Sequence, residues 1–208
     1  MAAKSARDKI IDAALDFAGR HSWESLRLHD VAAELKLELN DVRAYFREKE
    51  DITEAWFDRA DAAMLQVGVD PGFSGLTSRE RIHRLIMTWL FALSPHRRVT
   101  RQMIYGKLEP GHLHYQFAGL LRVSRTVQWV REGAHRDAVL PWRAFEETGL
   151  TAIYLATFFY WMRDESENAR RTSAFLDRLL GRAERLVQCF PGYFESHAQP
   201  GMTTPPAP

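Results

Sequence analysis

Apolar residues recur every three or four positions along most of this chain, which is the spacing of amphipathic α-helices. The first such stripe runs from Ile10 to Ala18, and Gly19 follows where a helix commonly ends. No segment shows the strict alternation of apolar and polar residues that is typical of a strand. We therefore predict an all-α protein.

Two short helical segments follow the first helix. Residues 28–35 place Leu28, Val31, Ala32 and Leu35 on one face, and after a break of three or four residues a second segment covers about 38–46. Two short helices joined by such a turn form a helix-turn-helix, in which the second helix lies in a DNA major groove and the first crosses the backbone. The spacing therefore predicts a DNA-reading unit at the start of the chain.

The remaining pattern predicts longer helices, with turn formers at 69–75 as the clearest break. Thr77 or Ser78 is the expected cap of the helix after that break. We expect an N-terminal domain at 6–66, a helical domain at 67–195 and a disordered tail at 196–208. The expected helices cover 49–67, 77–93, 95–107, 114–132, 142–162 and 168–188, with a loop at 133–141.

Three stretches of the first 65 residues carry a family resemblance. The chain reads IDAALDF at 11–17, DVA at 30–32 and YFREKEDI at 45–52. They resemble the tetracycline-repressor (TetR) family, whose Tyr-x-x-Phe-x-x-Lys-Glu-x-Leu ending brings its lysine to a DNA phosphate. The resemblance implies a three-helix DNA-binding domain followed by a helical effector-binding and dimerisation domain. It also implies a homodimeric, ligand-responsive transcriptional regulator, with repression as the expected outcome.

The C-terminal part carries a weaker resemblance. The stretches FYWMRDES at 159–166 and AFLDR at 174–178 look like a subset of these regulators. They also look like the lipid-binding accessory proteins of ubiquinone biosynthesis, which share the TetR fold. The alternative function is therefore a TetR-fold protein that no longer binds DNA and instead binds an apolar lipid or a quinone-biosynthesis enzyme.

The helix-turn-helix departs from the family pattern at three positions. Lys36 occupies the place of the usual turn glycine, Glu38 that of the N-cap serine, and Arg27 that of the Ser or Thr that opens the second helix. Lysine adopts the left-handed conformation only at some cost. We expect Asn40 or Asp41 to take over capping of the recognition helix.

The candidate DNA contacts follow from side-chain chemistry in this unit. Arginine reads guanine edges, which favours Arg43, while Tyr45 and Lys49 are suited to phosphates. The competing interpretation is that these are ordinary solvated residues. The complete candidate set is Arg27, His29, Asn40, Asp41, Arg43, Ala44, Tyr45 and Lys49.

The charge of the N-terminal residues disfavours DNA binding. The chain has 28 basic and 27 acidic side chains, and its first 60 residues have ten basic against thirteen acidic, a net charge of −3. DNA affinity depends strongly on phosphate neutralisation, so an acidic N-terminal domain favours the alternative function. Glu38 and Asp41 would repel phosphate, although a carboxylate can accept a hydrogen bond from a cytosine amino group.

Aromatic residues of the C-terminal part are numerous enough to line an apolar cavity between helices, although aromatics at helical spacing also form plain cores. The resemblance favours a cavity for a small apolar or aromatic effector. Apolar faces on the last two helices predict a four-helix interface between two copies of the chain. The pocket candidates are Trp89, Phe117, Leu121, Trp129, Tyr154 and Phe158. The interface candidates are Ile153, Thr157, Phe175, Leu179 and Leu186.

Several other classes of function are not favoured. The sequence has no Gly-rich phosphate loop, nucleophile elbow or Cys/His cluster, so we expect no enzyme and no cofactor. His112 and His114 are spaced to opposite sides of a helix, so we expect no metal site there. The local basic cluster at 97–101 is expected to be solvated.

The expected location is the cytoplasm. A single cysteine, Cys189, rules out an internal disulfide framework and suits a reducing compartment. Residues 1–7 lack the apolar core of a signal peptide. The longest apolar run, 150–162, is shorter than the roughly 20 residues that span a bilayer, so we expect no membrane insertion.

Overall fold

The computed structural model describes residues 5–107, 113–134 and 142–188, with the side chains at 107, 113–121, 142–143 and 187 outside that description. All regular structure in these ranges is helical, as predicted. The α-helices are α1 (Ala6–Arg20), α2 (Leu28–Leu35), α3 (Leu39–Arg43), α4 (Lys49–Gln66), α5 (Ser78–Leu93), α6 (Arg97–Lys107), α7 (Leu113–Gly133), α8 (Trp142–Trp161) and α9 (Arg170–Gln188). Short 3₁₀ turns are η1 (Val67–Val69), η2 (Ser94–His96) and η3 (Glu167–Ala169).

The helices begin where their capping residues lie. Ser5 caps α1, because its hydroxyl accepts the backbone N–H of Asp8 at 3.1 Å. Of the two predicted caps of α5, Thr77 takes the role and Ser78 begins the helix; Glu80 accepts the Thr77 N–H at 2.7 Å, which completes a reciprocal capping box. The apolar stripe of α1, from Ile10 to Ala18, is buried as its spacing predicts.

Two predicted helix starts shift in the structure. Residues 94–96 form the 3₁₀ turn η2, so the α-helix begins at Arg97 rather than at Pro95. Residue Asn168 adopts left-handed backbone angles (φ 51°, ψ 30°), so α9 begins at Arg170 rather than at Asn168. Asparagine tolerates this conformation better than most residues. The predicted loop at 133–141 lies mostly, and the predicted tail at 196–208 entirely, outside the described residues.

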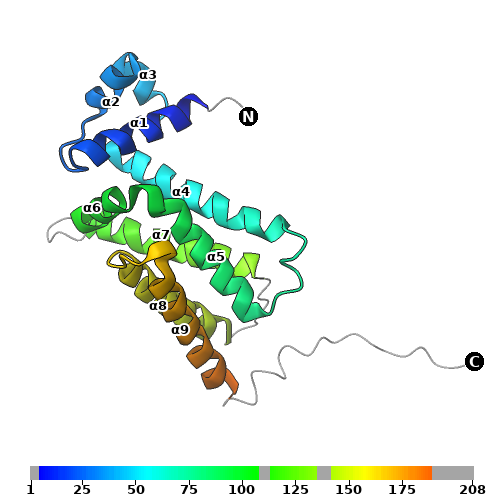
Figure 1. Cartoon of the computed structure of the whole chain (residues 1–208). Helices are drawn as coiled ribbons and strands as arrows, with labels where there is room; N and C mark the ends of the chain where they lie inside the picture. The colour runs from blue at the N-terminus through cyan, green and yellow to red at the C-terminus, as the bar shows by residue number, and fades with distance from the viewer. Residues whose placement is uncertain (1–4, 108–112, 135–141, 189–208) are drawn as a thin grey trace, which may run out of the picture.

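The N-terminal helices α1–α3 lie at one end of the molecule, and α8 and α9 lie at the other (Figure 1). Helix α4 connects the two ends, because it packs against α1 on one side and against α5 and α7 on the other. Its residues Ile52, Trp56 and Met64 are buried along its length. We call residues 6–66 the headpiece; α4 belongs to its core and to the core of the C-terminal helices.

A buried carboxylate fixes α4 against its neighbours. Asp61 accepts hydrogen bonds from the Trp89 indole at 2.8 Å and from the Thr126 hydroxyl at 3.1 Å. The Arg122 guanidinium of α7 donates to the same carboxylate at 2.6 Å and also pairs with Asp58. Burial raises the pKa of Asp61, and the Arg122 cation opposes that rise. These contacts hold α4, α5 and α7 in one register.

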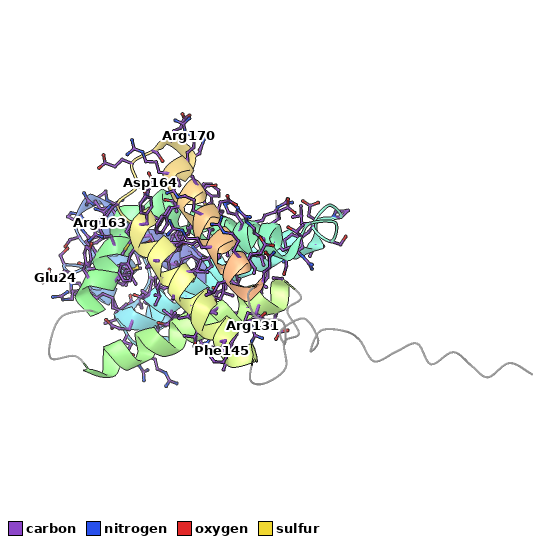
Figure 2. The ribbon with its side chains drawn as sticks, turned by 90° about the horizontal axis from the view of Figure 1, so that it is seen from below. Glu24, Arg131, Phe145, Arg163, Asp164 and Arg170 are labelled. Carbon is purple, nitrogen blue, oxygen red and sulfur yellow. The ribbon has the colours of Figure 1, made fainter. Side chains whose placement is uncertain are left out.

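A second buried carboxylate organises the connection between α8 and α9, which Figure 2 shows around the label of Asp164. Asp164 accepts the Ser166 N–H at 2.8 Å, the Thr172 N–H at 2.9 Å and the Thr172 hydroxyl at 2.6 Å. Burial alone would raise the pKa of Asp164, but the hydrogen bonds from Thr172 and Ser166 outweigh it. They lower the pKa to about 2, from an ordinary value of 3.8.

This pKa predicts an acid-sensitive contribution to stability. Because the folded pKa lies below the unfolded one, the contribution is complete above about pH 4 and is lost as the pH falls toward 2. Replacing Asp164 with Asn should lower the free energy of unfolding by about 2 kcal/mol at pH 7. Denaturant titrations should show this difference shrinking between pH 5 and pH 3.

The exposed neighbour Glu165 provides a matched control. Replacing Glu165 with Gln should change stability by less than about 0.5 kcal/mol at either pH. A difference between native protein and Asp164→Asn that stays constant from pH 5 to pH 3 would contradict the assigned role of the carboxylate charge.

Candidate nucleic-acid interface

Helices α2 and α3 are joined by a tight turn whose key residue is Lys36. It adopts left-handed angles (φ 55°, ψ 42°), as expected for the position where the family has glycine. The following N–H, from Leu37, donates to Ala32 O at 2.9 Å and closes the end of α2. A lysine in this conformation costs about 1 kcal/mol relative to glycine, so the turn is strained but formed.

The recognition helix α3 is capped by its own acidic residue. Glu38 occupies the N-cap position, and the Asp41 carboxylate accepts the Glu38 N–H at 3.0 Å. Neither Asn40 nor Asp41 takes the N-cap position, which Glu38 keeps; Asp41, at N3, supplies the reciprocal bond of a capping box. Val42 and Phe46 are buried and attach the helix to the headpiece core.

The opposite side of α3 faces solvent. Asn40, Asp41, Arg43, Ala44 and Tyr45 are all exposed, so the predicted contact residues of this helix share one accessible surface. Arg43 is the only basic residue within α3. The geometry makes base contacts possible for these side chains, and their contact with DNA stays a prediction.

The two candidates in and before α2 differ in their surroundings. Arg27 donates from Nη1 to the carbonyls of Glu24 at 2.7 Å and Leu26 at 3.0 Å, so its guanidinium lies against the preceding loop. Its backbone N–H donates to Asp30 at 2.9 Å, which caps α2. His29 is exposed, with Nε2 3.3 Å from Asp30 Oδ1.

Lys49 contacts the protein itself. Its ammonium donates to Trp23 O at 3.1 Å and Glu24 O at 3.3 Å, and lies 5.5 Å from the centre of the Trp23 ring. Burial lowers the pKa of Lys49, and the charge of Arg27 adds to this effect. The structure therefore places this ammonium as an anchor for the loop between α1 and α2.

Sequence reasoning missed a second set of contacts to the same loop. Helix α6 reaches it through Arg98, which donates to Gly19 O at 2.9 Å and His21 O at 3.2 Å, and through Gln102, which accepts the Trp23 N–H at 2.8 Å. The Trp56 indole of α4 also donates to the Thr100 hydroxyl at 3.0 Å. These bonds connect the C-terminal helices to the headpiece.

The expected solvation of the basic cluster at 97–101 holds for Arg98, which is exposed, but not for Arg97 and Arg101, which are partly buried. Besides Arg98, Arg97 donates to Asp164 O and lies 5.1 Å from the Trp161 ring, and Arg101 donates to Met162 O. The accepting carbonyls lie just after the last residue of α8, Trp161, where the negative end of the helix dipole also favours cations. Arg97 and Arg101 therefore hold the chain where α8 ends, while Arg98 holds the loop between α1 and α2.

Many of the headpiece carboxylates that give it a net negative charge form contacts within the protein. Arg59 pairs with Asp8 at 2.7 Å and with Asp12 at 2.6 Å, which joins α4 to α1. Asp51 accepts the N–H groups of Arg47 and Glu48 at the start of α4. Together with Asp30 and Asp41, several carboxylates thus face backbone donors or arginine rather than an incoming phosphate.

Comparisons with known proteins identify the family. The chain matches the crystal structure of a TetR transcriptional regulator from Nitrosomonas europaea with 54% identity and a TM-score of 0.78. The match covers 86% of this chain and 98% of that one. The chain belongs to the TetR family.

More distant comparisons agree on the TetR fold. A TetR regulator from Rhodococcus sp. RHA1 matches with 15% identity and a TM-score of 0.58, covering 84% of this chain and 92% of that one. A second regulator from the same organism matches with 18% identity and a TM-score of 0.54, covering 89% and 99%. The model of the COQ9 family matches residues 148–187, which agrees with the C-terminal resemblance. No curated protein matches the chain in sequence.

Among the predicted pocket residues of this TetR protein, three come together. The Trp89 ring lies 5.3 Å from Tyr154 and 5.6 Å from Phe158, and burial raises the pKa of the Tyr154 phenol. Trp129 does not join them, because it lies on the outer face of α7 with 43% of its surface exposed. The side chains of Phe117 and Leu121 lie outside the described residues.

The predicted interface residues of α8 and α9 divide into two groups. Ile153, Phe175 and Leu179 are half-buried within one chain, and Leu186 is 64% exposed. Thr157 was expected on the same face, and this expectation is wrong. Its side chain is fully buried within one chain, so it cannot contact a second copy, and its hydroxyl donates to Ile153 O at 2.7 Å.

In the described parts of the chain, no group of three or more His, Cys, Asp or Glu side chains is arranged to hold a metal ion. No described helix combines the length and the apolar character needed to cross a bilayer.

The anchoring role of Lys49 predicts a loss of stability on its removal. Replacing Lys49 with Met keeps an unbranched stem but removes the donor to Trp23 O and Glu24 O. Because hydrogen bonds to charged groups contribute about 1.5–3 kcal/mol, the free energy of unfolding should fall by about that amount. Exposed Lys9, replaced by Met, is the matched control and should change it little. Equal denaturation curves for the two variants would refute the anchor.

Proposed function

We propose that this protein is a homodimeric transcriptional regulator that binds a double-stranded DNA operator through α3. The observation that carries the proposal is the geometry of α2 and α3. A capped, two-helix unit attaches α3 by Val42 and Phe46 and leaves Asn40, Arg43 and Tyr45 accessible. The relative with 54% identity, described as a transcriptional regulator, supports it. We assign the protein no catalytic activity.

In this proposal three exposed polar residues of α3 and the turn after it have distinct tasks. A recognition helix contacts bases mainly with its N-terminal residues. Asn40 is suited to the N6 and N7 edge of adenine, and Arg43 to the O6 and N7 edge of guanine. Tyr45, just beyond the helix, is suited to a phosphate oxygen. Lys49 supports the loop next to this surface and does not supply the main charge.

Control by a small apolar or aromatic effector is the second part of the proposal. The aromatic cluster of Trp89, Tyr154 and Phe158 lies beside α4, because Trp89 donates directly to Asp61. A molecule that separates these rings would disturb the contact that holds α4. An effector that favours one position of α4 would change DNA affinity through its different affinity for the two states. Release of DNA, and so relief of repression, is the expected direction.

A second candidate function is supported by the COQ9 match at residues 148–187. In that case the protein would bind an apolar lipid or dock on a quinone-biosynthesis enzyme, and its headpiece would not bind DNA. The two functions differ in a measurable way. A protein that retains no DNA from a random duplex library at low salt, but binds lipid vesicles or quinones, would refute the regulator and support the second candidate.

The regulator makes a first prediction about Arg43. Replacing Arg43 with Ala should remove about 1–3 kcal/mol of discrimination at one base pair in each half-site, because a bidentate guanine contact is lost. The measurement is a selection from a random duplex library followed by titration of the best site and its single-base variants. Exposed Arg125 of α7, replaced by Ala, is the control and should preserve the sequence preference.

A uniform loss of affinity across all sites would contradict the prediction that Arg43 reads a base. If Arg43→Ala binds all variants more weakly by the same factor, Arg43 contacts phosphate and another residue reads the bases. A variant that should gain affinity is Glu38→Ser, because it removes a repulsive charge and supplies a favourable N-cap.

The dimer makes a second prediction, about Leu179. A charge buried without a partner is strongly destabilising, so Leu179→Glu should convert the dimer to a monomer in sedimentation at micromolar concentration. Ala174→Glu is the control, because Ala174 lies on a different side of α9, in the groove toward α5. That variant should remain dimeric. Native protein that sediments as a monomer would refute the proposed interface.

A further inference from the structure

An apolar side chain occupies the first position of the recognition helix. Leu39 is the N1 residue of α3, and 50% of its surface is exposed. The next apolar residue of the helix, Val42, is fully buried, as is Phe46 just after it. Half of the Leu39 surface is therefore accessible at the start of α3, beside the residues that hold the helix to the core.

The residues around Leu39 locate it within the accessible surface. Asn40 and Arg43 are exposed on the same short helix, and Glu38 precedes it as the N-cap. The exposed residues Leu37 and Tyr45 lie outside the helix, in the turn before it and just after its end. Leu39 is thus the large apolar side chain in the turn of the helix that enters the groove first.

The chemistry of the major groove selects a partner for this side chain. Each base pair presents hydrogen-bond donors and acceptors there, and the C5 methyl group of thymine is the apolar feature among them. Leucine offers no hydrogen bond, so covering the edge of a G·C pair would remove water from polar atoms without replacing it. When Leu39 packs against a thymine methyl group, the apolar surface of the leucine and that of the methyl group are both removed from water.

We propose that Leu39 is a specificity-determining residue that reads the C5 methyl of one thymine in each operator half-site. This inference rests on the proposed DNA-binding function and adds a defined base to it. The half-site then combines one apolar contact from Leu39 with polar contacts from Asn40 and Arg43. The preference for thymine comes from a methyl group and not from a hydrogen bond.

Deoxyuridine tests this contact, because it differs from thymidine only in lacking the C5 methyl. The best operator is first selected from a random duplex library, and each thymidine is then replaced by deoxyuridine in turn. Losing one buried methyl should weaken binding about fourfold at one position per half-site. Leu39→Ala should remove this difference at that position. Because Leu39 is half-exposed, the variant should keep the native melting temperature.

The exposed turn residue Leu37 supplies the matched control. Leu37→Ala should keep the fourfold preference for thymidine over deoxyuridine. If an operator is selected but no thymidine is sensitive, or if sensitivity persists in Leu39→Ala, the Leu39 contact is wrong while the regulator stands. If no duplex is selected even at low salt, the result contradicts both the proposed DNA-binding function and the Leu39 contact.

Discussion

The packing of this molecule depends on one buried carboxylate, that of Asp61. Removing a carboxylate from water costs several kcal/mol unless donors replace the lost hydration. The donors come from Trp89 of α5 and from Arg122 and Thr126 of α7, so α4 can neither slide nor turn against these helices without leaving polar groups unpaired. Because α4 also forms part of the headpiece, this site sets where the helix-turn-helix stands relative to the C-terminal helices.

Local features of the fold could be predicted from the sequence, whereas contacts between distant segments could not. Most helix bounds follow from spacing, although the starts of α6 and α9 do not, and the left-handed Lys36 follows from its place in the turn. The Asp61–Arg122 contact joins residues 61 positions apart, and neither residue stands out in a helical pattern. Such pairs appear only when the helices are placed in space.

At the candidate site, the exposure of side chains could be predicted from the sequence, but the partners of the cationic side chains could not. Exposure of Arg43 and Tyr45 could be predicted, because Val42 and Phe46 define the inner side of a short helix. The contacts of Lys49 and Arg98 could not, because a sequence shows where charges lie but not which backbone carbonyls lack partners. The burial of Thr157 could not be predicted either, because a sequence does not show which face of α8 the neighbouring helices cover.

The fixed register of α4 gives that helix the properties of a lever. Asp61 lies twelve residues beyond Lys49 along α4, a distance of about 18 Å at the rise of an α-helix. A tilt of roughly 5° about Asp61 would move the far end by about 1.6 Å, since displacement grows with distance from the pivot. Hydrogen bonds to base edges tolerate only about 0.5 Å. A disturbance too small to break the core could therefore move the recognition helix α3 by more than a base contact tolerates.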